Sequence, residues 1–170
     1  KRKEVYATTG PRMRVQLFAG WDFPADAETA ENFSALGYQH GVPMGSDLLA
    51  QQSSAKAPKF LVRAVKGPLD GNLDRVQMVK GWVDAEGHQQ ERVYNIAWSG
   101  DRILDSLGQL PAVGNTVDLK SGRYLNTIGQ AELATLWVDP DFDAQQAAFY
   151  YVRVLQIPTP RNGLLDSIAL

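Results

Sequence analysis

Cysteine is absent from the chain, and histidine is nearly so. Without cysteine there is no disulfide, no thiolate nucleophile and no thiolate metal ligand. A zinc site needs three or four converging ligands, and His40 and His88 alone cannot supply them from histidine and cysteine. We expect both histidines to be exposed loop residues. The compartment (cytoplasmic, periplasmic or secreted) stays open, because secreted proteins without disulfides exist.

Long hydrophobic runs and an imbalance of charge are also missing. No run of about 18 apolar residues is present, so no membrane-spanning segment is predicted. The chain has 17 Lys and Arg against 19 Asp and Glu, and this net charge of −2 gives no overall attraction to nucleic acid or to an anionic membrane. The glycine-rich phosphate-binding motifs and the Gly-x-Ser-x-Gly elbow are absent. The chain begins abruptly, without methionine, and we expect it to be a fragment of a longer protein.

What the chain does have is a series of short, alternating segments bounded by turns. Its 170 residues fit one domain with a core, and its 15 glycines and 9 prolines fit many turns. We therefore predict a mainly β fold, an antiparallel β-sandwich of about seven or more short strands with one short peripheral helix. The expected strands lie at residues 12–18, 59–66, 73–83, 92–98, 116–119, 124–128, 132–138 and 147–157.

Residues 147–161, AAFYYVRVLQIPTPR, are the stretch around which we expect the chain to be organised. Aromatic and β-branched side chains suit a strand, and Pro158 and Pro160 remove two backbone donors and end it. Both faces of this segment are largely apolar, which predicts a strand covered on both sides. The single predicted helix covers residues 25–36, with Asp26 as N-cap and Gly37 as its C-terminal stop.

The acidic segment Asp139, Asp141 and Asp143 has the D-x-D-x-D opening of a calcium loop. An EF-hand loop also needs Gly at position 6 and Glu at position 12, where this chain has Ala144 and Tyr150. We therefore interpret the segment as a turn in which Asp side chains accept backbone hydrogen bonds, and keep the three aspartates as weak metal candidates. No catalytic residue is assigned in this chain.

Two arginines lie beside rigid turns at strand ends. Arg12 follows Thr8-Thr9-Gly10-Pro11, and Arg161 follows Pro-Thr-Pro. A guanidinium fixed there suits a carboxylate or phosphate, or an ion pair to a neighbouring domain. We take Arg12, Arg161, Thr9 and Trp82 as candidates for substrate or domain-interface contacts. Trp21, Trp82, Trp98 and Trp137 would form either a stacking platform or, as we expect, part of the core and interface packing.

Five motifs, spread over nearly the whole chain, carry a family resemblance. They are EVYATTGPR (4–12), GVPMGSDL (41–48), LDRVQMVKGW (73–82), PAVGNTVD (111–118) and DPDFD with AFYYVRVL and IPTPR (139–161). Together they resemble the C-terminal part of the bacterial family called domain of unknown function 3604. Members of that family are longer, and their preceding part resembles the PHP (polymerase and histidinol phosphatase) fold, a metal-dependent phosphoesterase.

The resemblance implies a division of the chain and a role for it. Residues 1–12 would be the tail end of a PHP-like barrel region, and residues 13–170 the appended β domain. No cofactor is then expected in this fragment, because the divalent metal belongs to the absent upstream domain. The implied function is a non-catalytic accessory domain of a PHP-like hydrolase of unknown substrate. Its partner is the upstream domain of the same polypeptide, and an interface exposed by isolating the domain would favour self-association.

A second hypothesis comes from the tryptophans. In it the domain is a ligand- or carbohydrate-binding β-sandwich module that uses exposed tryptophans. This hypothesis requires at least two tryptophans that lie exposed in one groove. A third, that the fragment is itself an enzyme, requires a convergent polar cluster in a pocket.

Overall fold

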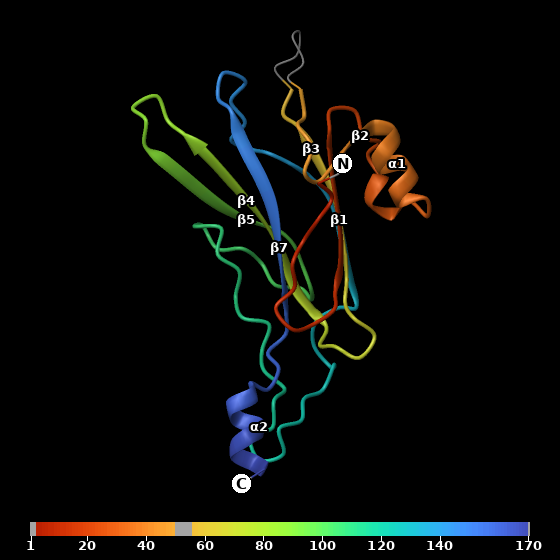
Figure 1. Ribbon diagram of the computed structural model, residues 1–170, viewed down its shortest axis with the longest axis vertical. Helices are drawn as coiled ribbons and strands as arrows, with labels where there is room; N and C mark the ends of the chain where they lie inside the picture. Colours follow the sequence, from red (N-terminus) through yellow and green to blue (C-terminus); the bar gives the residue numbers. More distant parts are fainter. Residues whose placement is uncertain (1–2, 50–55, 170) are drawn as a thin grey trace.

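The computed structural model describes residues 3–49 and 56–169, and in them seven strands form two antiparallel sheets. One sheet has the order β2-β1-β3-β6, and the other has the order β5-β4-β7 (Figure 1). The mainly β sandwich predicted from the sequence is thus confirmed. The strand bounds are β1 Arg14–Gly20, β2 Gly41–Pro43, β3 Lys59–Val65, β4 Leu73–Val83, β5 Gln89–Trp98, β6 Glu132–Val138 and β7 Ala148–Gln156.

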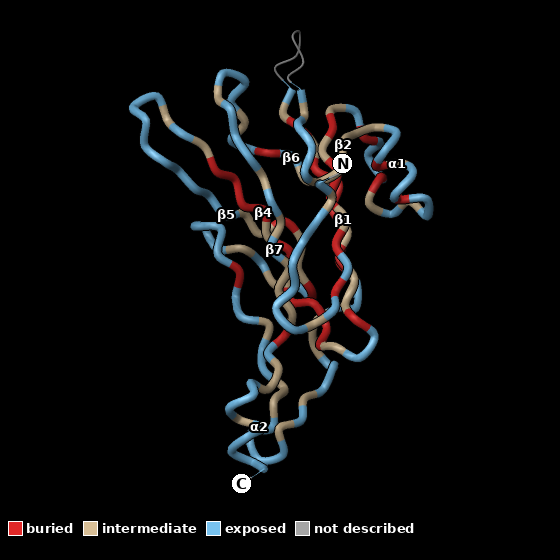
Figure 2. The backbone as a smooth tube through the Cα atoms, in the orientation of Figure 1, coloured by how far each residue is buried: buried red, intermediate tan, exposed pale blue. Residues whose placement is uncertain are grey.

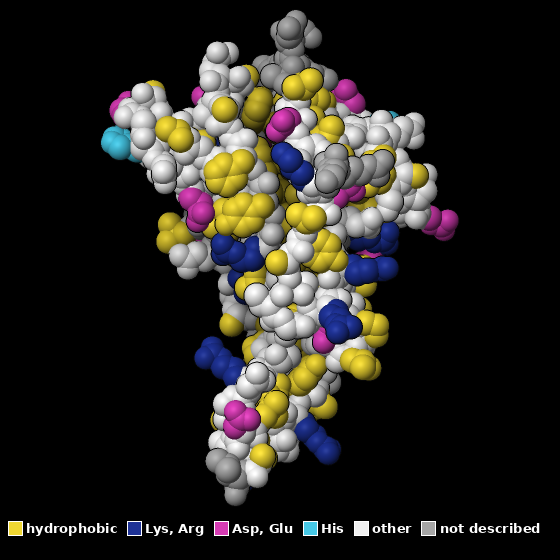
Figure 3. All heavy atoms as spheres, viewed as in Figure 1, with side chains coloured by type: hydrophobic (Ala, Val, Ile, Leu, Met, Phe, Trp, Pro, Cys, Tyr) yellow, Lys and Arg dark blue, Asp and Glu magenta, His cyan; other side chains and the backbone are white. Residues whose placement is uncertain are grey.

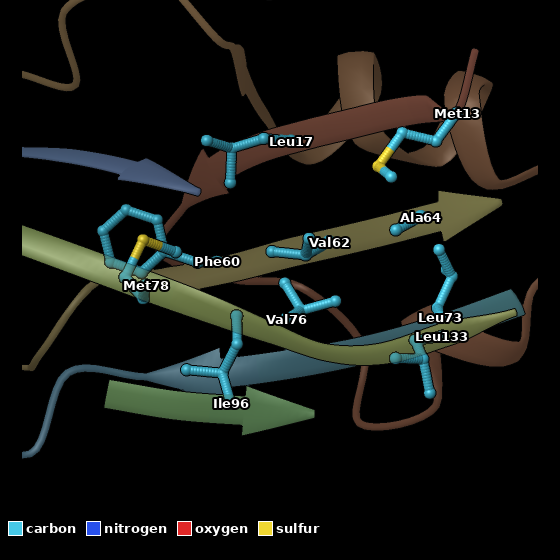
Figure 4. Close-up of a cluster of buried hydrophobic side chains, with 10 residues drawn as sticks. All are labelled: Met13, Leu17, Phe60, Val62, Ala64, Leu73, Val76, Met78, Ile96 and Leu133. Carbon is cyan, nitrogen blue, oxygen red and sulfur yellow. The ribbon is translucent and has the colours of Figure 1, made fainter. Parts of the chain in front are cut away.

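The core lies between the two sheets. Successive side chains of a strand point to opposite faces of a sheet, so the apolar side chains on one face of each sheet meet in the space between the sheets. Figure 4 shows apolar side chains from both sheets that point toward one another across this space. Its buried members are Met13, Leu17, Phe60, Val62, Ala64, Leu73, Val76, Met78, Ile96 and Leu133.

The helical part between β1 and β2 differs from the prediction. A 3-10 turn covers Ala27–Thr29 and helix α1 covers Phe33–His40, so the helix begins later than expected and continues through Gly37. Gly37 does not end the helix; a Cβ at this position would overlap the ring of Phe18. Glycine here allows α1 to approach β1 closely.

The two histidines differ in exposure. His40 is the last residue of α1 and is half-buried, which corrects the prediction of an exposed loop residue. His88 is exposed, as predicted.

Strand β7 is covered on one face only, which corrects the prediction of a strand buried on both sides. Tyr150, Val152 and Val154 pack against the core. On the opposite face Phe149 and Tyr151 are 62% and 40% exposed. β7 is also the edge strand of its sheet and pairs only with β4 among the described strands.

The chain between β5 and β6 and the C-terminus form an arm that the sequence did not predict. We call residues 111–128 together with helix α2, Asn162–Ala169, the stalk. Instead of strands at 116–119 and 124–128, this part has one isolated bridge between Asp118 and Arg123. Neither residues 111–128 nor α2 contains a buried residue. In Figure 2 the stalk extends below the sandwich and contains only exposed and intermediate residues.

Residues 3–13 precede β1 without a helix or strand. Residues 1–2 of the predicted barrel tail lie outside the described part of the chain, and the division at residue 12 stays a prediction. In the described ranges no helix is both long and apolar enough to cross a membrane.

Candidate functional site

The candidate residues from the sequence lie at two opposite ends of the sandwich. Thr9 and Arg12 come before β1, and Arg161 comes after β7, at the end from which the stalk extends. Trp82 lies near the other end, where β4 turns into β5. The structure therefore brings Arg12 and Arg161 to one end and separates both from Trp82.

Both arginines are fixed by their backbones and have exposed side chains. The Arg12 amide donates a hydrogen bond to Oδ2 of Asp70 at 2.8 Å. The Arg161 carbonyl accepts bonds from the amides of Leu164 (3.0 Å) and Leu165 (3.2 Å) and so begins helix α2. Arg12, Arg161 and Thr9 are all exposed. This arrangement leaves two guanidinium groups in solvent beside the root of the stalk.

The acidic segment after β6 forms the turn that the sequence predicts. The Asp141 amide donates to Oδ1 of Asp139 at 2.9 Å, and the Gln145 amide donates to Oδ1 of Asp143 at 2.8 Å. Such bonds between an Asp side chain and a nearby backbone amide are typical of turns. They account for the D-x-D-x-D spacing without a cation.

Lys80 reaches into this turn from the facing sheet. Its Nζ lies 2.7 Å from Oδ2 of Asp139, and it also donates to the Asp141 carbonyl at 2.7 Å. The hydroxyl of Tyr150 donates to the same Asp139 Oδ2 at 2.7 Å. The Lys80 and Asp139 side chains are 3% and 0% exposed. This buried carboxylate thus accepts from an ammonium group, a hydroxyl and an amide, which fill three of its roughly four acceptor sites.

The resemblance implies a divalent metal for the upstream region, and the residues described here do not fit a metal site of their own. In the described part of the chain, no three or more His, Cys, Asp or Glu side chains converge to hold a metal ion. Asp139 is instead bound by Lys80, and Asp141 is bound by the side chains of Arg92 and Tyr94. We therefore derive no reaction step through a metal in this domain.

A second layer of contacts completes the cluster. Oδ2 of Asp141 accepts a bond from the Tyr94 hydroxyl at 2.6 Å and lies 2.8 Å from Nη1 of Arg92. Burial, and next the hydrogen bond to Asp141, raise the pKa of Tyr94 above its usual range. Burial and the bond to Asp139 do the same for the pKa of Tyr150. Both tyrosines are therefore protonated donors at neutral pH.

We call this group the inter-sheet cluster; it consists of Lys80, Arg92, Tyr94, Asp139, Asp141 and Tyr150. Its cations and hydroxyls come from the β5-β4-β7 sheet, and its carboxylates come from the turn that follows β6 of the other sheet. Because both charges of the central pair are buried and satisfied, its chemistry is that of a structural lock between the sheets.

An open groove of about 1100 Å³ lies at the hairpin end, between the β4–β5 tip and the start of β7. Trp82 and Phe149 line it, with Gln90, Gln145 and other amide and acidic side chains. Asp84, one of these acidic groups, is used within the hairpin, where it accepts bonds from the His88 amide and the Gln90 side chain. Among the residues that the structure describes, no Lys, Arg, His, Ser or Thr lines the groove.

The four tryptophans do not share one surface. All are half-buried, and Trp82 and Trp98 lie toward opposite ends of the β5-β4-β7 sheet. Trp137 packs between Phe60 and Tyr94, with ring centroids 5.6 and 5.1 Å away. The indoles of Trp21 and Trp98 donate to backbone carbonyls at 3.2 and 2.7 Å. Their positions are those of packing residues, and of the four only Trp82 lines the groove.

Sequence reasoning missed the inter-sheet cluster. The available signal was Lys80 in the apolar segment of residues 76–83, because a lysine is almost never fully buried unless it is paired. Which carboxylate pairs with it depends on how the two sheets face one another, and Asp139 is 59 residues away in the chain.

These features define the class of protein as an antiparallel β-sandwich domain with an inter-sheet polar lock and a coreless stalk. Within that class, the chain belongs to the family described as "Protein of unknown function (DUF3604)", which matches residues 1–170. No curated protein and no solved structure shows a significant similarity to it.

Proposed function

We propose that this domain is the non-catalytic accessory domain of a longer PHP-like, metal-dependent hydrolase, and that its stalk docks on the catalytic domain. The family resemblance supports the kind of parent protein. The observation that carries the proposal is the stalk, which exposes apolar side chains and has no buried residue of its own. The divalent metal and the reacting groups then belong to the upstream domain.

The stalk exposes large apolar side chains that the rest of the domain does not cover. Leu119 and Leu125 are 70% and 63% exposed, and Leu165 and Ile168 of α2 are also exposed. An isolated helix as short as α2, which has eight residues, is only marginally stable in water. Its apolar side chains pack close to Gly122. A Cβ added to this glycine would lie 2.7 Å from the Leu165 side chain. Docking on a second domain would bury this apolar surface and stabilise the arm.

The exposed arginines suit the same interface. Arg161 begins α2 through its carbonyl, and Arg12 is held through its amide at the same end of the sandwich. Both guanidinium groups are therefore placed near the stalk root, where they would pair with carboxylates of the catalytic domain. The inter-sheet cluster, by contrast, uses its polar groups on one another and supports the fold.

The experiment uses the complete polypeptide, with metal content and phosphoesterase activity measured together. The double variant Leu119→Asp, Leu125→Asp places charges on the proposed interface at positions where the domain itself buries little. We expect it to lower activity at least tenfold, while the β-sandwich keeps its melting temperature. Leu49→Asp is the matched control, because Leu49 is 82% exposed but lies outside the stalk; it should leave activity unchanged.

Two results would refute the proposal. One is a stalk variant with full activity and full metal content. The other is metal binding and phosphoesterase activity in the 170-residue chain alone, which would make this domain catalytic.

A further inference from the structure

The outer face of the β5-β4-β7 sheet, turned away from the other sheet, is a regular array of side chains. The antiparallel register places three rows across the strands. From the hairpin end they are Glu91–Gly81–Phe149, Val93–Val79–Tyr151 and Asn95–Gln77–Arg153. The array therefore has two aromatic side chains in one column and polar groups at both of its ends.

The two aromatic rings are nearly parallel and exposed. The planes of Phe149 and Tyr151 differ by 10°, and the ring centroids are 6.4 Å apart. Their exposed fractions are 62% and 40%. Gly81 creates the space for this arrangement, since a Cβ there would overlap the distal atoms of the Phe149 ring. Figure 3 shows aromatic side chains open to solvent over the upper part of β7.

Hydrogen-bonding groups flank the rings. Arg153 lies one row beyond Tyr151, with Nη2 3.5 Å from its hydroxyl. Gln77 donates to Oδ1 of Asn95 at 3.0 Å in the same row. Glu91 lies at the other end of the array and is exposed. Glu91 and Arg153 are thus the exposed polar groups at the two ends of the ring pair, whereas Gln77 and Asn95 are half-buried and Asn95 also donates to the Gly108 carbonyl at 3.1 Å.

We propose that this outer face is a binding site for a neutral oligosaccharide chain, which lies along β7 over Phe149 and Tyr151. The faces of aromatic rings carry partial negative charge and attract the weakly positive C–H groups on one side of a sugar ring. Sugar hydroxyls then meet the exposed carboxylate of Glu91 and guanidinium of Arg153, which fix orientation as polar groups do in ligand sites.

Other ligands fit this face less well. Nucleic acid binding relies on several Lys or Arg contacts to phosphates, whereas the array holds one arginine and one glutamate. A stable protein interface buries about 800 Å² on each partner with a hydrophobic centre. Here the exposed apolar surface is essentially two rings and Val93, in a polar surround.

The site goes beyond the proposed accessory role and does not depend on it. The stalk and the outer face use different residues, so a domain that docks through one remains free to bind through the other. The site also differs from a tryptophan-based platform, because none of the four tryptophans belongs to the array.

The test is affinity electrophoresis of the complete polypeptide in native gels that contain hydroxyethylcellulose, xylan, mixed-linkage β-glucan, galactomannan or amylopectin. We expect at least one of these neutral polysaccharides to retard the protein. Phe149→Ala should weaken that retardation at least tenfold, and Gly81→Ala should also weaken it by displacing the ring. Tyr6→Ala is the matched control, because Tyr6 is an exposed aromatic residue outside the array; it should bind like the wild type.

Folding is checked by the melting temperature of each variant, and Tyr151→Ala provides a second exposed substitution if Phe149→Ala does not fold. Retardation by none of the five polysaccharides would overturn the proposal. Equal retardation of the wild type and a folded Phe149→Ala or Tyr151→Ala variant would do so as well. If either variant instead separated the domain from a protein partner without any polysaccharide binding, the proposal would be overturned and the face would be a protein contact.

Discussion

Nζ of Lys80 lies 2.7 Å from Oδ2 of Asp139, and this buried pair joins the two sheets of the sandwich. Lys80 comes from β4 of one sheet, and Asp139 directly follows β6 of the other. The hydroxyl of Tyr150 donates to the same carboxylate oxygen. The pair therefore fixes how one sheet sits over the other toward the hairpin end.

Removing the lysine should leave a buried carboxylate without its cation. We expect Lys80→Met to lower the free energy of unfolding by about 3–5 kcal/mol, because an uncompensated buried charge is strongly destabilising. The double variant Lys80→Met, Asp139→Asn should recover part of this loss, since the amide that replaces the carboxylate is neutral and keeps hydrogen-bonding capacity. Urea denaturation measures all three proteins. A loss below about 1 kcal/mol in the single variant, with no recovery in the double, would contradict a buried lock.

Alternation along the strands was enough to predict most of the sheet. Strand β6 matches the predicted 132–138 and β4 the predicted 73–83, because their apolar and turn residues are locally distinct. The helix end was missed at Gly37, since its contact with Phe18 is tertiary. The exposed face of β7 was missed because an apolar side chain signals burial whether or not a neighbour covers it.

The candidate site was less predictable than the fold. The turn chemistry of Asp139 is local and followed from its spacing, but its partner Lys80 depends on sheet packing. The array on the outer face depends on the register between β4, β5 and β7, which the alternation of each strand does not determine. Residues 111–128 have irregular backbone, and the short stretches that predicted strands at 116–119 and 124–128 gave no indication of a stalk.

Alkaline pH should weaken the fold through the two half-buried tyrosines of the inter-sheet cluster. In the folded state the pKa values of Tyr94 and Tyr150 are raised above 10, the ordinary value. Below pH 10 both states are protonated, so the stabilisation is fully present; above it the unfolded chain loses protons first, and stability falls as pH rises. Urea unfolding from pH 8 to 11 should show a smaller decline for Tyr150→Phe than for the wild type. Parallel declines in the two proteins would refute this contribution.

Two helical glycines should respond in opposite ways to alanine. Gly37→Ala should lower the free energy of unfolding by about 1–3 kcal/mol, because its Cβ would overlap the Phe18 ring in a packed region. Gly163→Ala meets no atom within 4 Å and should be neutral or stabilise α2 by up to about 1 kcal/mol. Thermal unfolding compares the two. Equal effects would show that packing against Phe18 does not distinguish them.

Arg102 should not be replaceable by lysine. Its Nε donates to the Ser99 carbonyl at 3.1 Å, and Nη1 donates to the Pro111 carbonyl at 2.9 Å. Nη2 lies 2.7 Å from Oδ1 of Asp74. An ammonium group cannot reproduce this fork, so Arg102→Lys should cost about 1–3 kcal/mol and loosen the start of the stalk. Arg14→Lys, at an exposed position of β1, is the control and should change the melting temperature little; similar shifts for both variants would argue against the fork.

The most direct test of the proposed docking role is amide hydrogen exchange of the stalk, in the proposed longer polypeptide and in the 170-residue chain alone. If the stalk docks on the catalytic domain, amides of α2 and of residues 119–125 should exchange at least tenfold more slowly in the complete polypeptide. Amides of β3 and β4 in the sandwich core serve as the internal reference and should exchange alike in both. Equal exchange of the stalk in the two proteins would contradict the account.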